Sequence, residues 1–180
     1  MSKLDKKYAG EYVLNPSAGR GSPDRILYIG DWYIFDKDKK TVKKGKVLSF
    51  SFALFSAALF IFCGFLDCSA NFTPYVFLPF VILFLPICFL LYNSFMLFFL
   101  GEKLTHKQFD KNVAALKRYA VAVSAISSLS LVCDILMYFI SESKNLRNDI
   151  VFTIGLIFIV VFSAFCVKIQ QYLTCSQISQ

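Results

Sequence analysis

Four long runs of apolar residues, separated by short polar segments, dominate the pattern of this chain. They cover residues 47–66, 75–100, 119–140 and 150–173. Each run is near or beyond the roughly 20 residues with which a helix, rising about 1.5 Å per residue, crosses a hydrocarbon core about 30 Å thick. The first two runs carry no charge, the third contains only Asp134, and the fourth contains only Lys168. We therefore expect four transmembrane helices over these ranges.

The polar region before the first run, residues 1–46, contains one segment with a strand pattern. Residues 26–35 consist of two short β-branched and aromatic stretches on either side of Gly30-Asp31. A two-residue connection that contains glycine is typical of a β-hairpin, so we predict a hairpin here. Because an isolated hairpin is marginal in water, it must pack on something. Two roles stay open: it seals the inner mouth of the helix bundle, or it docks a partner through an exposed edge.

A second polar segment lies between the second and third runs. Thr105 and Gln108 fit a capping box, which places a helix start near His106, and apolar residues follow at helical spacing. We expect an amphipathic stalk over residues 105–118 that leads into the third transmembrane helix. A short tail over residues 174–180 should lie on the same side of the membrane.

The basic residues are divided unequally between the two sides of this pattern. Of the 19 Lys and Arg residues, 17 fall on one side: eleven before the first run, five between the second and third, and one near the end of the fourth. Short cytoplasmic loops of membrane proteins carry an excess of Lys and Arg, so both termini are expected in the cytoplasm. The sequence thus predicts a multi-pass protein of the cell membrane. Its fold class is all-α, with four transmembrane helices and a small cytoplasmic hairpin.

Composition and net charge agree with a membrane protein and give no support to nucleic-acid binding. The chain is 57% apolar and 17% aromatic, and its net charge is +7. Lysines clustered beside a transmembrane segment attract anionic lipid headgroups by about 1 kcal/mol per residue. Aromatic residues with a polar edge suit the same boundary. A candidate surface for lipid or a partner protein therefore consists of Trp32, Tyr33, Lys43, Lys44 and Lys46.

The third run contains the candidate intramembrane site. A charged group at the centre of a transmembrane helix costs roughly 2.5–3.5 kcal/mol, so Asp134 needs an explanation. It lies about 9 Å from the outer end of the run. Ser124, Ser127 and Ser130 lie on the same side of the helix, and such residues usually face neighbouring helices. Three interpretations stay open: a hydrogen bond inside the bundle, a proton- or cation-coupled pathway, and pairing with a partner subunit.

Two prolines inside the second run are candidate hinges. Pro79 and Pro86 each remove a helical hydrogen bond one turn earlier in the chain. Membrane helices also tolerate such prolines as packing features, so both interpretations stay open.

The sequence contains no motif for catalysis, a cofactor or a metal. His106 is the only histidine, and one histidine cannot form a metal site by itself. Cys63, Cys68 and Cys133 lie toward the outer end, a placement that resembles quinone-linked membrane thiol oxidoreductases. The spacing of the first two is C-x4-C, whereas that family carries C-x-x-C, and its long outer loop with further cysteines is absent. A redox enzyme of this type would form a disulfide among these three residues.

We therefore predict a protein that works by association rather than catalysis, and we expect no cofactor. It would be an accessory subunit or a self-assembling bundle, with a membrane protein or a second copy of itself as partner. The alternative is a small oligomeric transporter or channel that uses Asp134 and the serine-rich face of the third helix.

Overall fold

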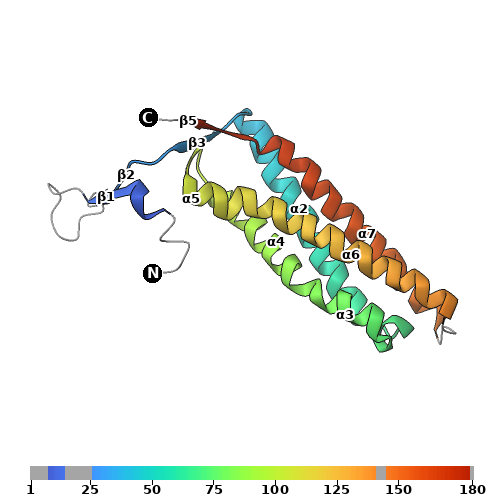
Figure 1. Ribbon diagram of the computed structural model, residues 1–180. Coiled ribbons are helices and arrows are strands. Elements are labelled where there is room, and N and C mark those ends of the chain that lie inside the picture. The colour runs from blue at the N-terminus through green and yellow to red at the C-terminus, as the bar shows by residue number, and fades with distance from the viewer. Residues whose placement is uncertain (1–7, 15–25, 141–144, 179–180) are drawn as a thin grey trace.

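The computed structural model describes residues 8–14, 26–140 and 145–178 of the chain. Figure 1 shows an elongated bundle of helices with short strands gathered at one end. We call this end the basic end, because the lysines that precede and begin the first long helix lie there, as do those of residues 103–118. Some predicted basic positions lie outside the described residues, namely Lys3, Lys6, Lys7, Arg20, Arg25 and Lys144.

Four helical segments make up the bundle, and each is long and apolar enough to cross a membrane. Their main elements are α2 (Lys39–Gly64), the pair α3 (Pro74–Ile82) and α4 (Phe84–Met96), α6 (Ala115–Ile140) and α7 (Leu146–Ile169). Short 3-10 helices join or extend them: η3 (Ser69–Phe72), η4 (Leu97–Phe99) and η6 (Gln170–Tyr172). The prediction of four long apolar helices is confirmed.

The first helix begins earlier than its apolar run. Helix α2 starts at Lys39, whereas the run predicted a start at residue 47. Lysine is a good helix former, so the lysine-rich segment simply extends the helix. The glycine in this lysine-rich segment, Gly45, is explained by packing: a Cβ at this position would lie 3.1 Å from the Cβ of Tyr172 in η6.

The second helical segment is interrupted once, at Leu83 between α3 and α4. Pro86 lies one turn further on and has no N–H with which to bond the Ile82 carbonyl, which accounts for the break. Pro79 lies inside α3 without interrupting it. Whether either proline works as a hinge stays a prediction.

The third helical segment starts at the predicted capping box. The Thr105 hydroxyl accepts from the Gln108 N–H at 3.3 Å, and the Gln108 side chain accepts from the Thr105 N–H at 3.1 Å. A first turn, α5 (His106–Gln108), is followed by a π-helical stretch, η5 (Phe109–Ala114), which runs directly into α6. A wide turn of this kind inserts a residue into the helix and often accompanies a functional site.

The predicted hairpin over residues 26–35 is wrong. Two strands do form there, β2 (Ile26–Tyr28) and β3 (Trp32–Phe35), but they belong to different sheets. Strand β2 pairs antiparallel with β1 (Tyr12–Leu14). Strand β3 is the centre of a three-stranded antiparallel sheet, between β4 (Lys103–Thr105) and β5 (Cys175–Ile178). The predicted tail therefore contributes a strand.

Two features explain why β2 and β3 do not pair with each other. A hairpin with β2 would provide backbone hydrogen-bond partners along only one edge of β3. Strands β4 and β5 provide such partners along both edges. In addition, Gly30 is used for a close contact rather than for a primed turn. A Cβ at this position would lie 2.8 Å from the Tyr28 hydroxyl oxygen and 2.9 Å from the Glu11 Cβ, and Gly30 does not adopt a positive φ.

The larger buried cluster lies in the basic half and ties the sheet to the helices. Leu104 of β4 and Leu173, just before β5, are buried in the same cluster as residues of α4 and α6. Tyr33 and Phe35 of β3 pack against this cluster. The sheet is thus an integral cap on the basic end of the bundle.

A second buried cluster fills the opposite half. It includes Cys63 of α2, Phe80 of α3, Met137 of α6 and Phe152 of α7, so all four helical segments meet there. Helices α2 and α7 approach closely, because a Cβ added to Gly155 would overlap the Cys63 Sγ.

The outside of the bundle is apolar and its inside holds polar groups. Exposed side chains include Phe65, Phe77, Phe139 and Phe158. Fully buried polar side chains occur at Ser49, Ser56, Ser94, Ser127, Ser130, Asp134, Asp149 and Ser163. This distribution is the reverse of that in a water-soluble domain.

Candidate functional site

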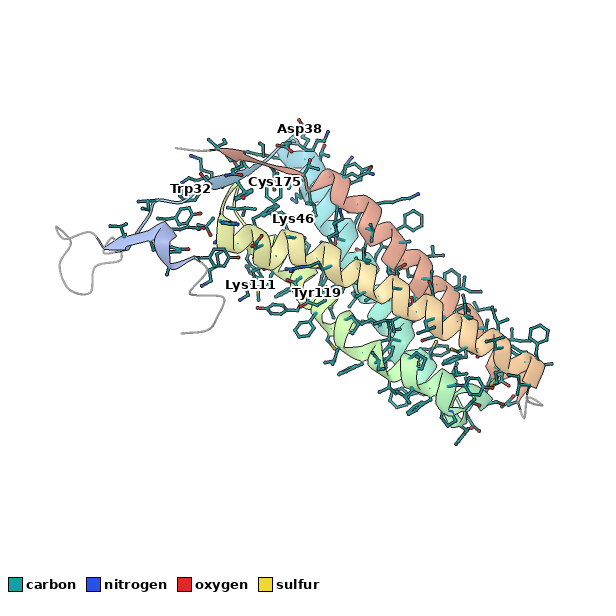
Figure 2. The ribbon with its side chains drawn as sticks, viewed as in Figure 1. Trp32, Asp38, Lys46, Lys111, Tyr119 and Cys175 are labelled. Atoms are coloured by element: carbon teal, nitrogen blue, oxygen red, sulfur yellow. The ribbon has the colours of Figure 1, made fainter. Side chains whose placement is uncertain are left out.

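The basic end contains the main candidate site, and β3 positions it. This strand leads straight into α2 and places Ile34 and Phe35 beside the first turns of that helix. The Asp36 N–H donates to the Thr174 carbonyl at 3.0 Å, which fixes the junction between the strand and the helix. Trp32, Asp38 and Lys46 all lie at this end of the bundle (Figure 2).

A cavity of about 350 Å³, the basic cavity, lies between β3, the first turns of α2 and the chain that follows η4. Four lysines and one glutamate supply its charges. Its lining consists of Ile34, Phe35, Lys37, Lys39, Val42, Lys43, Lys46, Leu100, Gly101 and Glu102. Positive charge therefore exceeds negative charge in a pocket that also has apolar walls.

Lys46 is the most deeply placed of these lysines. Its ammonium group donates to the Leu100 carbonyl at 2.8 Å and lies 5.4 Å from the centre of the Phe35 ring. The thiol of Cys175 in β5 is nearby. Burial and the negative charge of Asp36 raise the pKa of this thiol to about 12, against the opposing effect of Lys46. The thiol is therefore neutral at ordinary pH.

A second space of about 570 Å³ is an open depression along the exposed face of α2, and it adjoins the basic cavity through Lys43, which lines both. The rest of its lining consists of Lys40, Lys44, Val47 and Leu48. We call it the apolar groove, because its walls are made almost wholly of carbon, including the aliphatic stems of the lysines. It points from the lysines toward the long apolar part of α2.

The predicted surface at this end is only partly brought together. Lys43, Lys44 and Lys46 line the two cavities, but Trp32 and Tyr33 do not. Trp32 packs edge-to-face on Tyr28 at 5.0 Å, and Tyr33 stacks on Phe109 of η5 with ring centres 4.4 Å apart. The two aromatic residues therefore support the sheet. Sequence reasoning missed Lys37, Lys39 and Glu102 as lining residues.

His106 is at the centre of a polar cluster that joins the N-terminal segment to the start of the third helical segment. Its Nδ1 lies 2.8 Å from Glu11 Oε1, and its Nε2 lies 3.8 Å from Asp110 Oδ2. Tyr8 donates to that same Asp110 oxygen at 2.7 Å. Burial is the main factor that raises the pKa of Tyr28, which also contacts Glu11. Sequence analysis considered His106 only as a metal ligand and missed this cluster, because its partner Glu11 is far away in the chain.

Asp134 is fully buried between α6 and α7. Its Oδ2 accepts from the Thr153 hydroxyl at 2.5 Å, and that hydroxyl oxygen lies 3.1 Å from the Tyr138 hydroxyl. The other carboxyl oxygen, Oδ1, has no hydrogen-bond partner among the residues that the structure describes. The pair Asp134–Thr153 thus links two long helices through a single oxygen.

Two of the three predicted serines of α6 use their hydroxyls within their own helix and not on Asp134. Ser127 and Ser130 are buried and donate to carbonyls of their own helix, at Val123 and Ile126, over 2.7 and 3.1 Å. Ser124 is half-buried. Hydroxyls bonded in this way pack as small residues at a helix contact.

Asp149 is a buried carboxylate that sequence reasoning missed. It lies in the first turn of α7, one residue before the fourth apolar run, and so was assigned to a loop. Its two oxygens accept from the backbone N–H of Ser69 at 2.7 Å and from the Ser69 hydroxyl at 3.0 Å. The sequence did contain one indication of this role: Asp149 would lie in the first turn of the helix, where the helix dipole favours an acidic residue.

Redox and metal chemistry find little support in the arrangement of side chains. Cys63, Cys68 and Cys133 are free thiols, so the disulfide expected of a redox enzyme is not formed. Within the described ranges, no three His, Cys, Asp or Glu side chains gather where they could hold a metal ion.

The chain matches no protein-family model, no curated protein and no solved structure.

Proposed function

We propose that this protein is inserted in the cell membrane and works there by association, as an accessory subunit or a self-assembling bundle. Insertion is supported by the apolar outer surface described above, where Phe65 and Phe139 are 86% and 82% exposed. In water such a surface would be a severe aggregation hazard. In lipid it matches the solvent, and each helix satisfies its own backbone hydrogen bonds.

The proposed orientation places the basic end, and with it both termini, in the cytoplasm. The support is the positive-inside bias, applied to the lysines of α2 and of residues 103–118. Arg147, at the start of α7, is the described basic residue of the opposite end.

One observation supports association over catalysis. Each of the ionisable side chains that could take part in catalysis already connects two elements of the fold. His106 joins the third helical segment to the N-terminal segment through Glu11. Asp134 joins α6 to α7, and Asp149 joins α7 to η3. What is left on the surface of the long helices is apolar area, which is suited to contact with lipid or with other membrane helices.

Site-specific photo-crosslinking in intact membranes tests this proposal. A photoreactive phenylalanine analogue would replace one exposed residue at a time: Phe55 of α2, Phe77 of α3, Phe139 of α6 or Phe158 of α7. Association predicts protein adducts from one or two of these positions, while the others react only with lipid. Phe152 of α7, which is buried, is the control and should give no adduct. Lipid adducts alone at every exposed position, together with a monomeric mass in nanodiscs, would contradict the proposal.

The second candidate function is a small oligomeric transporter or channel. It is favoured by one observation, the unpaired Oδ1 of the fully buried Asp134, since ionisable groups at such depth often bind or carry ions. The hydroxyls of Ser127 and Ser130, which are bonded within their own helix, give this pathway no polar lining. In liposomes, Asp134→Asn should abolish any pH-dependent flux, and unchanged flux would remove this residue from the mechanism.

A further inference from the structure

The first turns of α2 present a basic stripe to the basic cavity. Val42 and Lys43 lie three and four residues after Lys39, and four and three residues before Lys46, so the four share one face of the helix. All four line the cavity. The lysines are therefore directed by the helix into one pocket instead of being spread around it.

The positive charge in this pocket is largely uncompensated. Lys39 pairs with Glu102 at 2.6 Å, and both side chains are exposed, at 83% and 68%, so this pair is weak. Lys46 uses one of its three protons on the Leu100 carbonyl. Lys37 and Lys43 have neither a hydrogen-bond nor an ion-pair partner among the described residues. One glutamate thus faces four lysines.

The end of α2 adds to this positive field. The helix has 26 residues, and the side chain of its N-cap residue, Asp38, makes no capping hydrogen bond. The positive end of the helix dipole therefore lies beside the lysines, at the same helix end as the carboxylate of Asp38.

The apolar groove distinguishes an amphiphile from a soluble anion. It shares Lys43 with the basic cavity and extends along the surface of α2 to Val47 and Leu48. Lys46 is the last residue before the long apolar part of that helix, so the cavity lies where the helix passes from polar to apolar surroundings. A molecule with a charged head and an acyl chain fits both parts at once.

From this arrangement we propose that the basic cavity binds the headgroup of an anionic phospholipid that carries at least two negative charges. A phosphomonoester or a pair of phosphates occupies the space between Lys37, Lys43 and Lys46, and an acyl chain lies in the apolar groove. Lysine binds phosphate as a point charge without a fixed geometry, which suits this set of side chains. Basic pockets beside cytoplasmic ends of membrane helices bind lipid headgroups of this class. The proposal rests on membrane insertion as proposed above.

Lipid retention by the purified protein tests the proposal. The full chain is extracted from nanodiscs of phosphatidylcholine that contain equal charge as phosphatidic acid or as phosphatidylglycerol, and retained lipid is counted by native mass spectrometry. The site variant is Lys37→Gln with Lys43→Gln, since these two side chains line the cavity without a hydrogen bond or an ion pair to a described residue. The matched control is Lys111→Gln with Lys117→Gln, two exposed lysines of the same end that line neither the basic cavity nor the apolar groove.

The unmodified chain and the control variant should retain phosphatidic acid in preference to phosphatidylglycerol. The site variant should lose about 25-fold in retention, at about fivefold for each lysine removed near the membrane surface. Equal losses in both variants would overturn the proposal in favour of diffuse surface attraction. Equal retention of the two lipids would overturn the requirement for two charges. Displacement of the lipid by millimolar inorganic phosphate would assign the cavity to a soluble anion.

Failure of this inference can be separated from failure of the proposed function. A protein that alkaline carbonate strips from membranes is not inserted, and both proposals fail. A protein that resists carbonate but shows no lipid preference removes the headgroup site alone. Equal far-UV circular dichroism and equal melting temperatures of the two variants establish that folding is unchanged.

Discussion

Replacing Asp149 by alanine should destabilise the fold more than any other single change at the end opposite the basic end. The carboxylate is fully buried and accepts two hydrogen bonds from Ser69 of η3, at 2.7 and 3.0 Å. Each bond to a charged group contributes about 1.5–3 kcal/mol, and its position in the first turn of α7 adds about 0.3–1 kcal/mol. We expect Asp149→Ala to lower the free energy of unfolding by about 3–7 kcal/mol.

Two milder variants make this expectation more specific. Ser69→Ala removes only the hydroxyl bond and leaves the backbone N–H donating to Asp149, so it should cost about 1.5–3 kcal/mol. Asp149→Asn keeps the size and one acceptor oxygen and should fall between the two alanine variants. Because Ser69 and Asp149 are in direct contact, the double alanine variant should show a coupling energy of about 1 kcal/mol.

The assay is equilibrium unfolding in mixed micelles of a mild detergent and sodium dodecyl sulfate, followed by far-UV circular dichroism. The order of destabilisation should be Ser69→Ala, then Asp149→Asn, then Asp149→Ala. If Asp149→Ala unfolds within about 0.5 kcal/mol of the unmodified chain, the carboxylate does not join α7 to η3, and the reasoning on buried charge is refuted.

Three further predictions concern other contacts. Gly155→Val should cost about 1–3 kcal/mol because its side chain overlaps the Cys63 Sγ, and Cys63→Ala should recover part of that loss in the same unfolding assay. His106→Ala should speed amide exchange in strand β1 while leaving the melting temperature of the bundle nearly unchanged; protection equal to that of the unmodified chain would argue against the contact with Glu11. Cys175 should react with maleimide at pH 8 more than about a hundredfold slower in the folded than in the unfolded chain, since burial raises its pKa to about 12. The stability that this buried thiol contributes is complete below its unfolded pKa of 9.0 and is lost as the pH rises toward 12, so a base-induced decrease that is the same in Cys175→Ser would contradict it.

The helices could be predicted from sequence because their determinants are local. A run such as residues 75–100 is long and apolar whatever surrounds it, and Thr105 with Gln108 specifies a helix start within four residues. The interruption before Pro86 follows from the chemistry of proline alone. In each case the residues that decide the structure are neighbours in the chain.

The sheet and the polar contacts could not be predicted in this way, because their partners are distant in sequence. Tyr33 pairs with Leu104 on one side and with Gln177 on the other, and this register depends on how four helices pack. Glu11 and His106 are both ordinary surface residue types until the fold brings them to 2.8 Å. The basic cavity was predicted only in part: Lys43 and Lys46 were expected at this surface, but Lys39 and the wall formed by Leu100 and Glu102 were not.

The order in which the three strands of the larger sheet occur along the chain has a consequence for biosynthesis. β3 is translated before the first long helix, β4 after the second and β5 after the fourth. In the membrane insertion proposed above, two crossings separate each strand from the next, so all three strands reach the same side. The sheet would then close last, after every helix has inserted with the correct polarity. A nascent chain in which one helix failed to cross would keep β3 with an open edge, which is a target for aggregation and for quality-control proteases.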